Sequence, residues 1–222
     1  MESHPVKILK TEYITHDVRR FRVEKPEGYK YIPGQATEVT IPGLEDKVGK
    51  GPFTFTSLNE EPELEFSIKI YKNVDGLTKE LSKLNAGDKI ILHDVWGAIN
   101  FDGPGVFFAG GAGVTPFIAI FRQLFKDGKV NGNKLIFSNK TEKDIILKDE
   151  FEKMLGGNFI NTITEEKTDK YFNKRIDEEL IKKLVKDFNQ HFYICGPEKF
   201  VQDIQKILEN LGVSKDLIVI EK

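Results

Sequence analysis

Two glycine turns are the residues of this sequence best suited to chemistry. The first is Gly110-Gly111-Ala112-Gly113, which follows the apolar run 106–109 and precedes Thr115 and Pro116. Glycines leave backbone N–H groups uncovered, and a helix beginning at Pro116 with Thr115 as its cap directs its positive dipole end at the same place. The pattern suits a phosphate or another electron-rich group. It is also common in plain strand-to-helix connections.

The second turn, Cys195-Gly196-Pro197-Glu198, follows the apolar run 191–195. If these two runs are the first and fourth strands of a doubly wound sheet, they are neighbours, and both turns lie at the carboxyl edge where such sheets bind ligands. Cys195 is the single cysteine, and taken alone it is typical of a small buried hydrophobe. One cysteine cannot form an internal disulfide or hold an iron–sulfur cluster, so any one-electron partner is a separate molecule.

The second half of the chain alternates strands with helices after the segment 101–105. Alternating strands and helices of this kind predict a five-stranded parallel sheet covered on both faces. The expected strands are 106–109, 134–138, 159–164, 191–195 and 217–220, and the expected helices begin at Pro116 or cover 148–155, 177–186 and 197–211.

The first half has mostly a period of two, which is typical of antiparallel strands. The run 63–71 alternates cleanly and predicts a half-buried strand with Glu65, Ser67 and Lys69 on its polar face. Six short strands at this spacing predict a six-stranded antiparallel β-barrel interrupted by one helix at 76–84. The expected strands are 6–14, 18–23, 36–41, 52–57, 63–71 and 89–93. We therefore expect a barrel domain at 1–102 and a nucleotide-binding domain at 103–222.

Composition excludes several other classes of function. The net charge of -2 over 222 residues gives no support to nucleic-acid binding. No apolar run reaches the roughly 18 residues of a membrane span, and the first residues lack an apolar signal core, so we expect a cytoplasmic protein. There is no G-x-S-x-G, H-E-x-x-H or G-K-[ST] motif, the four histidines are scattered, and we expect no metal site.

Five motifs in order give the chain a resemblance to a known family. They are P-G-Q at 33–35, P-F-T-F-T-S at 52–57, G-L-T at 76–78, G-G-A-G-V-T-P at 110–116 and C-G-P at 195–197. Together they resemble the ferredoxin–NADP reductase family over nearly the whole chain, most closely its compact flavodoxin or ferredoxin reductase-like branch. The resemblance implies FAD as cofactor, NADPH or NADH as co-substrate, and a separate electron acceptor such as ferredoxin, flavodoxin or a haem protein.

The resemblance also implies flavin-binding residues in the barrel. In the family, one strand supplies an aromatic residue that packs on the flavin, a hydroxyl that reaches flavin N5 and an arginine that binds phosphate. Phe53 and Thr54 match the first two, but Gly51 stands in place of the arginine, and Lys50 is a point charge that could replace it. This departure leaves FMN or weakly held FAD open. The other implied flavin residues are Pro52, Ile70, Tyr71, Gly76, Leu77 and Thr78, the last three opening a helix with a hydroxyl cap.

In the second domain the resemblance implies a pyridine-nucleotide site. Its phosphate turn is Gly111, Gly113, Val114 and Thr115, and its nicotinamide-flanking segment is Cys195, Gly196 and Glu198. Ser138 and Lys140 lie where the adenosine ribose or its 2′-phosphate is read, which slightly favours NADPH over NADH. The candidate catalytic residues are Thr54, Thr115 and Cys195. We expect a hydride to pass from nicotinamide to flavin while the protein aligns the two rings and excludes water.

Two other functions fit the same residues. The loss of the arginine at Gly51 is compatible with a flavin-poor nucleotide-sensing or partner-binding module, and a reductase of free flavin would bind flavin as a substrate rather than as a prosthetic group. The oligomeric state and the identity of the acceptor are open at this stage.

Overall fold

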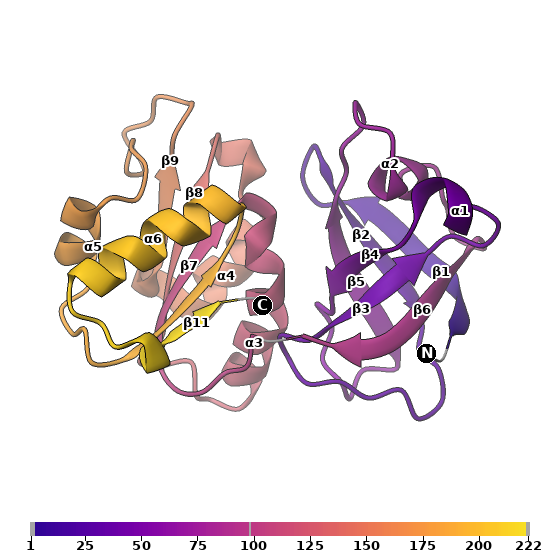
Figure 1. Ribbon diagram of the computed structural model, residues 1–222, viewed down its shortest axis with the longest axis horizontal. Helices are drawn as coiled ribbons and strands as arrows, with labels where there is room; N and C mark the ends of the chain where they lie inside the picture. Colours follow the sequence, from indigo (N-terminus) through magenta and orange to yellow (C-terminus); the bar gives the residue numbers. More distant parts are fainter. Residues whose placement is uncertain (1–2, 98, 221–222) are drawn as a thin grey trace.

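The computed structural model describes residues 3–97 and 99–220. These residues form two sheets, an antiparallel sheet of six strands from the first half and a parallel sheet of five strands from the second (Figure 1). The fold class predicted from the sequence is therefore correct. The last strand of the first sheet ends at Trp96 and the first strand of the second begins at Gly105, so the predicted boundary after residue 102 lies in the connection between them.

The six strands of the first sheet occur in the order β4-β3-β6-β1-β2-β5. An isolated antiparallel bridge between Phe55 and Phe66 joins the end of β4 to β5 and closes the sheet into a barrel. The strands are β1 (His4–Tyr13), β2 (Val18–Glu24), β3 (Ala36–Thr40), β4 (Gly51–Thr54), β5 (Glu63–Lys69) and β6 (Lys89–Trp96), with short helices α1 (Glu45–Val48) and α2 (Leu77–Leu81). Helix α1 was not predicted from the sequence.

Strand β5 is buried on both faces, which corrects the prediction of a half-buried strand. Leu64, Phe66 and Ile68 point into the barrel core, as the alternation predicts. On the other face, however, Glu65 and Ser67 are only 5% and 6% exposed. Period two identified the barrel interior correctly, but it could not show that a second domain covers the outer face.

The parallel sheet has the order β11-β10-β7-β8-β9, so the first and fourth strands, β7 and β10, are neighbours as predicted. Helices α3 and α4 pack on one face around Phe107, Phe121 and Phe151, and α5 and α6 pack on the other around Phe108 and Ile204. The strands are β7 (Gly105–Gly110), β8 (Lys134–Asn139), β9 (Phe159–Ile163), β10 (His191–Cys195) and β11 (Ile218–Ile220). The helices are α3 (Thr115–Lys126), α4 (Lys148–Leu155), α5 (Glu178–Leu184) and α6 (Glu198–Asn210), with 3-10 turns η1 (Gly111–Val114), η2 (Glu142–Asp144), η3 (Gly156–Asn158) and η4 (Lys215–Leu217).

Both predictions of a hydroxyl cap are wrong. The turn η1 runs directly into α3, so Thr115 is already helical, and its hydroxyl donates to the Ala112 carbonyl at 3.0 Å. At α2 the residue before the helix is Gly76, and the Thr78 hydroxyl instead accepts a hydrogen bond from the Tyr71 N–H at 3.3 Å. Among the described residues, no helix is long and apolar enough to cross a membrane.

Candidate functional site

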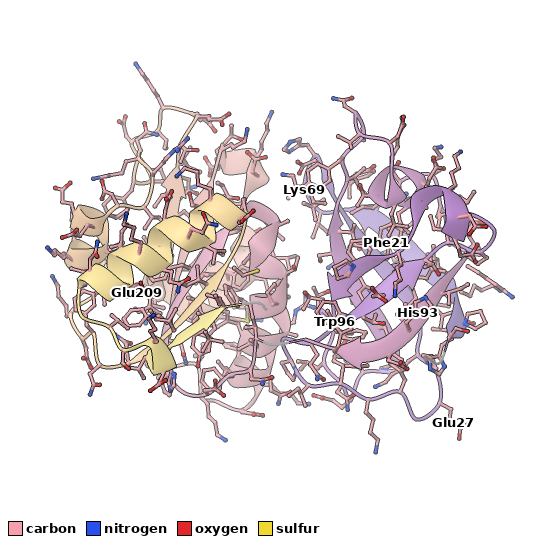
Figure 2. All side chains as sticks on the ribbon, in the orientation of Figure 1. Phe21, Glu27, Lys69, His93, Trp96 and Glu209 are labelled. Atoms are coloured by element: carbon pink, nitrogen blue, oxygen red, sulfur yellow. The ribbon has the colours of Figure 1, made fainter. Side chains whose placement is uncertain are left out.

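A cleft of about 710 Å³ lies between the barrel and the parallel sheet and is lined by both. Its size is that of a small-molecule or cofactor site. The barrel contributes Pro52, Phe53, Thr54, Ser67, Ile68, Lys69, Tyr71 and Thr78, and Figure 2 shows Lys69 on the side of the barrel that faces the second domain. The second domain contributes Gly110, Gly111, Ala112, Gly113, Thr115, Pro116, Ser138, Asn139, Lys140, Asp144, Thr164, Cys195, Gly196, Pro197 and Phe200.

The two glycine turns contact each other on the side of the cleft that the second domain forms. A Cβ on Gly113 would lie 2.3 Å from the Cys195 carbonyl oxygen and 2.5 Å from the Gly196 Cα. A Cβ on Gly196 would lie 3.2 Å from the Gly110 Cα. Glycine is required at these positions because the backbones of the two turns are in direct contact, and the result is a wall of bare peptide at the carboxyl edge of β7 and β10.

The first turn also places a helix end at the cleft. Gly111 has φ of +53°, a conformation that favours glycine, and it starts the 3-10 turn that leads into α3. Pro116 lies in the first helical turn, where its missing N–H costs no hydrogen bond. Val114 is fully buried and packs into the core, which fixes the turn to the sheet. The glycine turn η1 therefore forms the N-terminal end of the continuous η1–α3 helix at the cleft, and the first N–H groups of η1 are the ones suited to anions.

The barrel wall offers aromatic and hydroxyl groups to the same cleft. Phe53 and Thr54 belong to β4, and Tyr71 follows β5 with 52% of its surface exposed. Flat aromatic faces beside a hydroxyl suit a planar heteroaromatic ring, so these residues fit a flavin. All three predicted catalytic residues, Thr54, Thr115 and Cys195, line the cleft, as do most of the predicted binding residues.

Six of the predicted binding residues do not line the cleft. Lys50 forms an ion pair with Glu38, and the exposed side chain of Glu198 accepts a hydrogen bond from Gln202 at 3.0 Å. Ile70, Leu77 and Val114 are buried in the hydrophobic cores, and Gly76 has open space around its Cα. The replacement of the family arginine by Lys50 therefore receives no support from the position of this side chain.

Sequence reasoning missed several lining residues. Ser67 and Lys69 were assigned to the solvent face of their strand, and this face is in fact covered by the second domain. Asn139 and Thr164 come at the ends of β8 and β9, where the rule on carboxyl edges could have found them. Phe200 lies in the first turn of α6, and its ring packs over Gly110 and Gly196, so only the fold brings it to the cleft.

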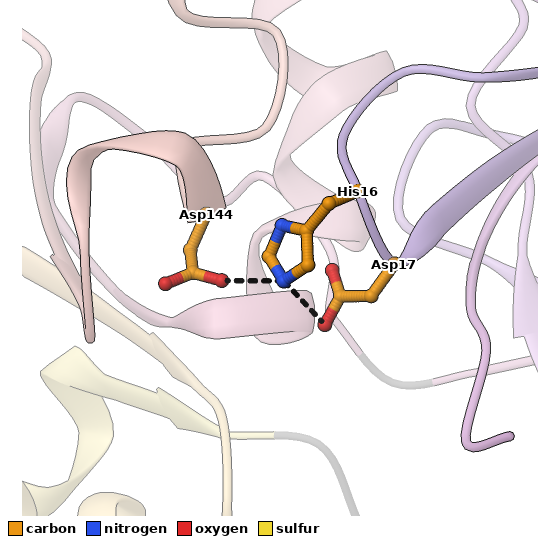
Figure 3. A group of neighbouring side chains, drawn as sticks. All are labelled: His16, Asp17 and Asp144. Carbon is orange, nitrogen blue, oxygen red and sulfur yellow. Dashed lines mark ion pairs between the residues drawn. The ribbon is translucent and has the colours of Figure 1, made fainter.

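A small polar cluster links the two domains at the edge of the cleft (Figure 3). His16, from the turn between β1 and β2, places Nε2 at 3.5 Å from an Asp144 oxygen and 3.7 Å from an Asp17 oxygen. Burial by itself would raise the pKa of Asp17, but Lys69 at 2.8 Å and His16 outweigh it and hold that pKa below 3.8. His16, one of the four scattered histidines, therefore joins the barrel to η2, which is a structural role. The absence of a resident metal stays a prediction.

The structure thus combines a closed barrel and a five-stranded parallel sheet, and both line one cleft between them. Residues 107–206 match the oxidoreductase NAD-binding domain family. The structure superposes on a ferredoxin NADP+ reductase from Neisseria gonorrhoeae with bound FAD and NADP, with a TM-score of 0.84, 20% identity, and coverage of 99% of this chain and 98% of that chain.

Two sequence relatives extend the likeness to the whole chain. The propane 2-monooxygenase reductase component of Rhodococcus jostii (strain RHA1) is 26% identical over 97% of this chain, which spans only 62% of that relative. The NADH-cytochrome b5 reductase 2 of Mus musculus is 26% identical over 98% of this chain and 94% of the relative. These comparisons agree with the resemblance to ferredoxin–NADP reductase-like oxidoreductases that the motifs indicate.

Proposed function

We propose that this protein binds FAD against its barrel, accepts reducing equivalents from NADPH or NADH, and delivers electrons to a separate acceptor protein. The single observation that carries the proposal is the shared cleft, whose barrel wall bears Phe53, Thr54 and Tyr71 and whose opposite wall is the pair of glycine turns. When bound, a flavin supplies the chemistry of accepting a hydride from reduced nicotinamide and releasing electrons one at a time.

The residues of the barrel wall would hold and orient the flavin. Phe53 and Tyr71 offer aromatic faces, and Thr54 offers a hydroxyl that can donate to a ring nitrogen or accept from it. Thr78 lines the same wall from α2, near the place where the family holds the flavin phosphates. Gly51 brings no charge there, so we propose that FAD is held by stacking more than by phosphate contacts.

The opposite wall would hold the pyridine nucleotide. Gly111 and Gly113 form the bare turn at the helix end, which suits the nucleotide phosphates, and Thr115 lines the cleft beside them. Cys195 and Gly196 lie where the two domains face each other. None of these groups needs to act as a strong acid or base. Their task is to orient two planar rings and to keep water from between them.

The choice between the two nucleotides rests on the residues after β8. Lys140 lines the cleft and forms an exposed ion pair with Glu165 at 3.0 Å, an interaction that a 2′-phosphate could replace. Ser138 lines the cleft beside it. We propose a preference for NADPH on this ground.

Ferredoxin, flavodoxin or a haem protein is the proposed kind of acceptor. The relatives include a monooxygenase reductase component and a cytochrome b5 reductase by name, which supports a separate protein acceptor without choosing among these. A cytoplasmic location stays a prediction from the sequence.

Reconstitution tests the proposal against its rivals. The full chain is mixed with FAD, FMN or riboflavin, desalted, and its retained absorbance is measured for each. We expect FAD to be retained and riboflavin to be lost. Retention of no flavin would contradict the proposal and favour a nucleotide-binding module, and catalytic consumption of added riboflavin without retained flavin would favour a free-flavin reductase.

A further inference from the structure

Arg122 makes a polar contact between the second domain and the barrel, beside the cleft. It lies on α3, and its Nη1 donates to Glu65 Oε1 and to the Thr56 carbonyl oxygen, each at 2.7 Å. Its Nε and Nη2 donate to the two carboxylate oxygens of Glu150 on α4 at 2.5 and 3.0 Å. The guanidinium therefore binds its own domain through Nε and Nη2 and the barrel through Nη1, using the forked geometry that only arginine offers.

Glu65, the barrel partner of Arg122, is a buried carboxylate with its hydrogen bonds satisfied. Its side chain is 7% exposed, and Oε1 also accepts from the Thr56 hydroxyl at 2.9 Å. The other carboxylate oxygen, Oε2, lies 3.4 Å from Arg22 Nε and 3.9 Å from Arg20 Nη1. Burial by itself would raise the pKa of Glu65, but Arg122, Thr56 and Arg20 outweigh it and hold the pKa below 4.5. The carboxylate therefore stays charged, and it depends on the second domain for its strongest partner.

Both barrel contacts of Arg122 lie two residues from a residue that lines the cleft. Glu65 lies two residues before Ser67 on the same face of β5, and Thr56 lies two residues after Thr54. Along α3, Arg122 is two helical turns after Thr115, and Figure 1 shows this helix on the side of its sheet that faces the barrel. One side chain, only 16% exposed, thus connects the strands that carry the barrel wall to the helix that follows the first glycine turn.

The other ion pair between α3 and the barrel does not have these properties. Lys126 pairs with Glu60, and the two side chains are 54% and 46% exposed. Exposed pairs contribute little and are screened by salt. Lys126 lies on the same helix and contacts the same domain, so it is a matched control for Arg122.

We propose that Arg122 is a positioning residue, which fixes the separation of the two cleft walls through Glu65 and the Thr56 carbonyl and so sets the distance across which the reaction occurs. The inference rests on the proposed function. Transfer between two bound rings is steeply sensitive to their separation, and a displacement of about 1 Å can slow such a step by roughly 100-fold.

The test compares Arg122→Met, Glu65→Gln/Arg122→Met and the control Lys126→Met. Arg122→Met alone leaves the buried Glu65 carboxylate without its strongest partner, so we expect this variant to be destabilised for that reason. The double variant removes this charge, so its melting temperature is expected to recover toward that of the unmodified protein. In the double variant we expect the rate constant of flavin reduction by NADPH to fall by about tenfold or more, with nucleotide affinity changed by less than about twofold. Lys126→Met should match the unmodified protein.

A second readout does not involve any bound cofactor. Amide hydrogen exchange of the full chain without flavin should rise in the double variant at residues 54–57 and 64–67 and at the N-terminus of α3, and remain unchanged in Lys126→Met. If the double variant folded normally and had the reduction rate and the exchange protection of the unmodified protein, Arg122 would be merely structural and the inference would be overturned. Failure of the unmodified protein to be reduced at all would overturn the proposed function, whereas the exchange result would still decide whether Arg122 holds the walls together.

Discussion

The contact between the two glycine turns makes Gly113→Ala the most informative single substitution. Gly113 does not have a positive φ, so the added methyl group meets no backbone strain and acts only through the space it occupies. That space contains the Cys195 carbonyl group and the Gly196 Cα, at 2.3 to 2.5 Å from the new Cβ. All of these are backbone atoms, which cannot rotate away as a side chain would.

The size of the effect follows from these distances. Ordinary contact for a Cβ begins at 3.4 Å, so the turn after β7 and the turn after β10 must separate by about 1 Å. Overpacking of this kind costs about 1–3 kcal/mol. For a chain of this size, that corresponds to a loss of about 2–4 °C in melting temperature for each kcal/mol. Because the displaced atoms are the nucleotide-side wall, we expect nucleotide affinity to fall by about tenfold, equivalent to about 1.4 kcal/mol.

The assay measures both quantities on the flavin-loaded protein, with thermal unfolding for stability and titration with the oxidised nucleotide for affinity. Gly157→Ala is the matched control, because Gly157 also has no positive φ, and its Cβ would meet nothing within 4 Å. We expect the control to behave as the unmodified protein. If Gly113→Ala retained full nucleotide affinity, the turns would not form the nucleotide wall, and the assignment of the site would be wrong.

Four further substitutions test individual parts of the site. Gly51→Arg should lower the dissociation constant of FAD, measured by fluorescence quenching. The Leu77 methyl group, 2.9 Å from the new Cβ, must move aside for this. An unchanged dissociation constant would mean that position 51 does not lie beside the flavin phosphate. Thr54→Val should slow flavin reduction in rapid mixing with only a modest loss of flavin, and full activity would remove Thr54 from the mechanism. Lys140→Ala should raise KM for NADPH by about fivefold, the equivalent of roughly 1 kcal/mol, without changing KM for NADH. Equal changes in both KM values would show that Lys140 does not bind the 2′-phosphate. The folded pKa of Glu65 lies below its ordinary 4.5, so its contribution to stability is complete above about pH 4.5 and is lost as the pH falls through the lower value. In Glu65→Gln the urea midpoint of unfolding should therefore depend less on pH below pH 4.5 than in the unmodified protein. The same pH dependence of the midpoint in both proteins would contradict this.

The sequence was sufficient to predict how the second wall of the cleft is built. The rule that places β7 beside β10 depends only on the alternation of strands and helices, and the glycines that close the contact are visible as residue types. The meeting of Gly113 with Cys195 therefore followed from topology. The same rule, applied to β8 and β9, would also have indicated Asn139 and Thr164.

The barrel wall was harder to predict because its residues depend on neighbours distant in sequence. A period of two separates the faces of β5, but it cannot tell solvent from a second domain, so Glu65 and Ser67 were placed on the wrong kind of surface. The pairing of Lys50 with Glu38 depends on the register of β3 and β4. Arg122 gave no signal, since an arginine on an amphipathic helix is usually solvated.

The most direct test of the account is anaerobic reduction of the FAD-reconstituted protein by NADPH and by NADH, followed at the flavin absorbance band. The account predicts that the band bleaches within the catalytic timescale with at least one nucleotide, faster with NADPH, and that the colour returns when an electron acceptor is added. A reconstituted protein whose bound flavin stays oxidised with both nucleotides would contradict the claim that the shared cleft brings flavin and nicotinamide together.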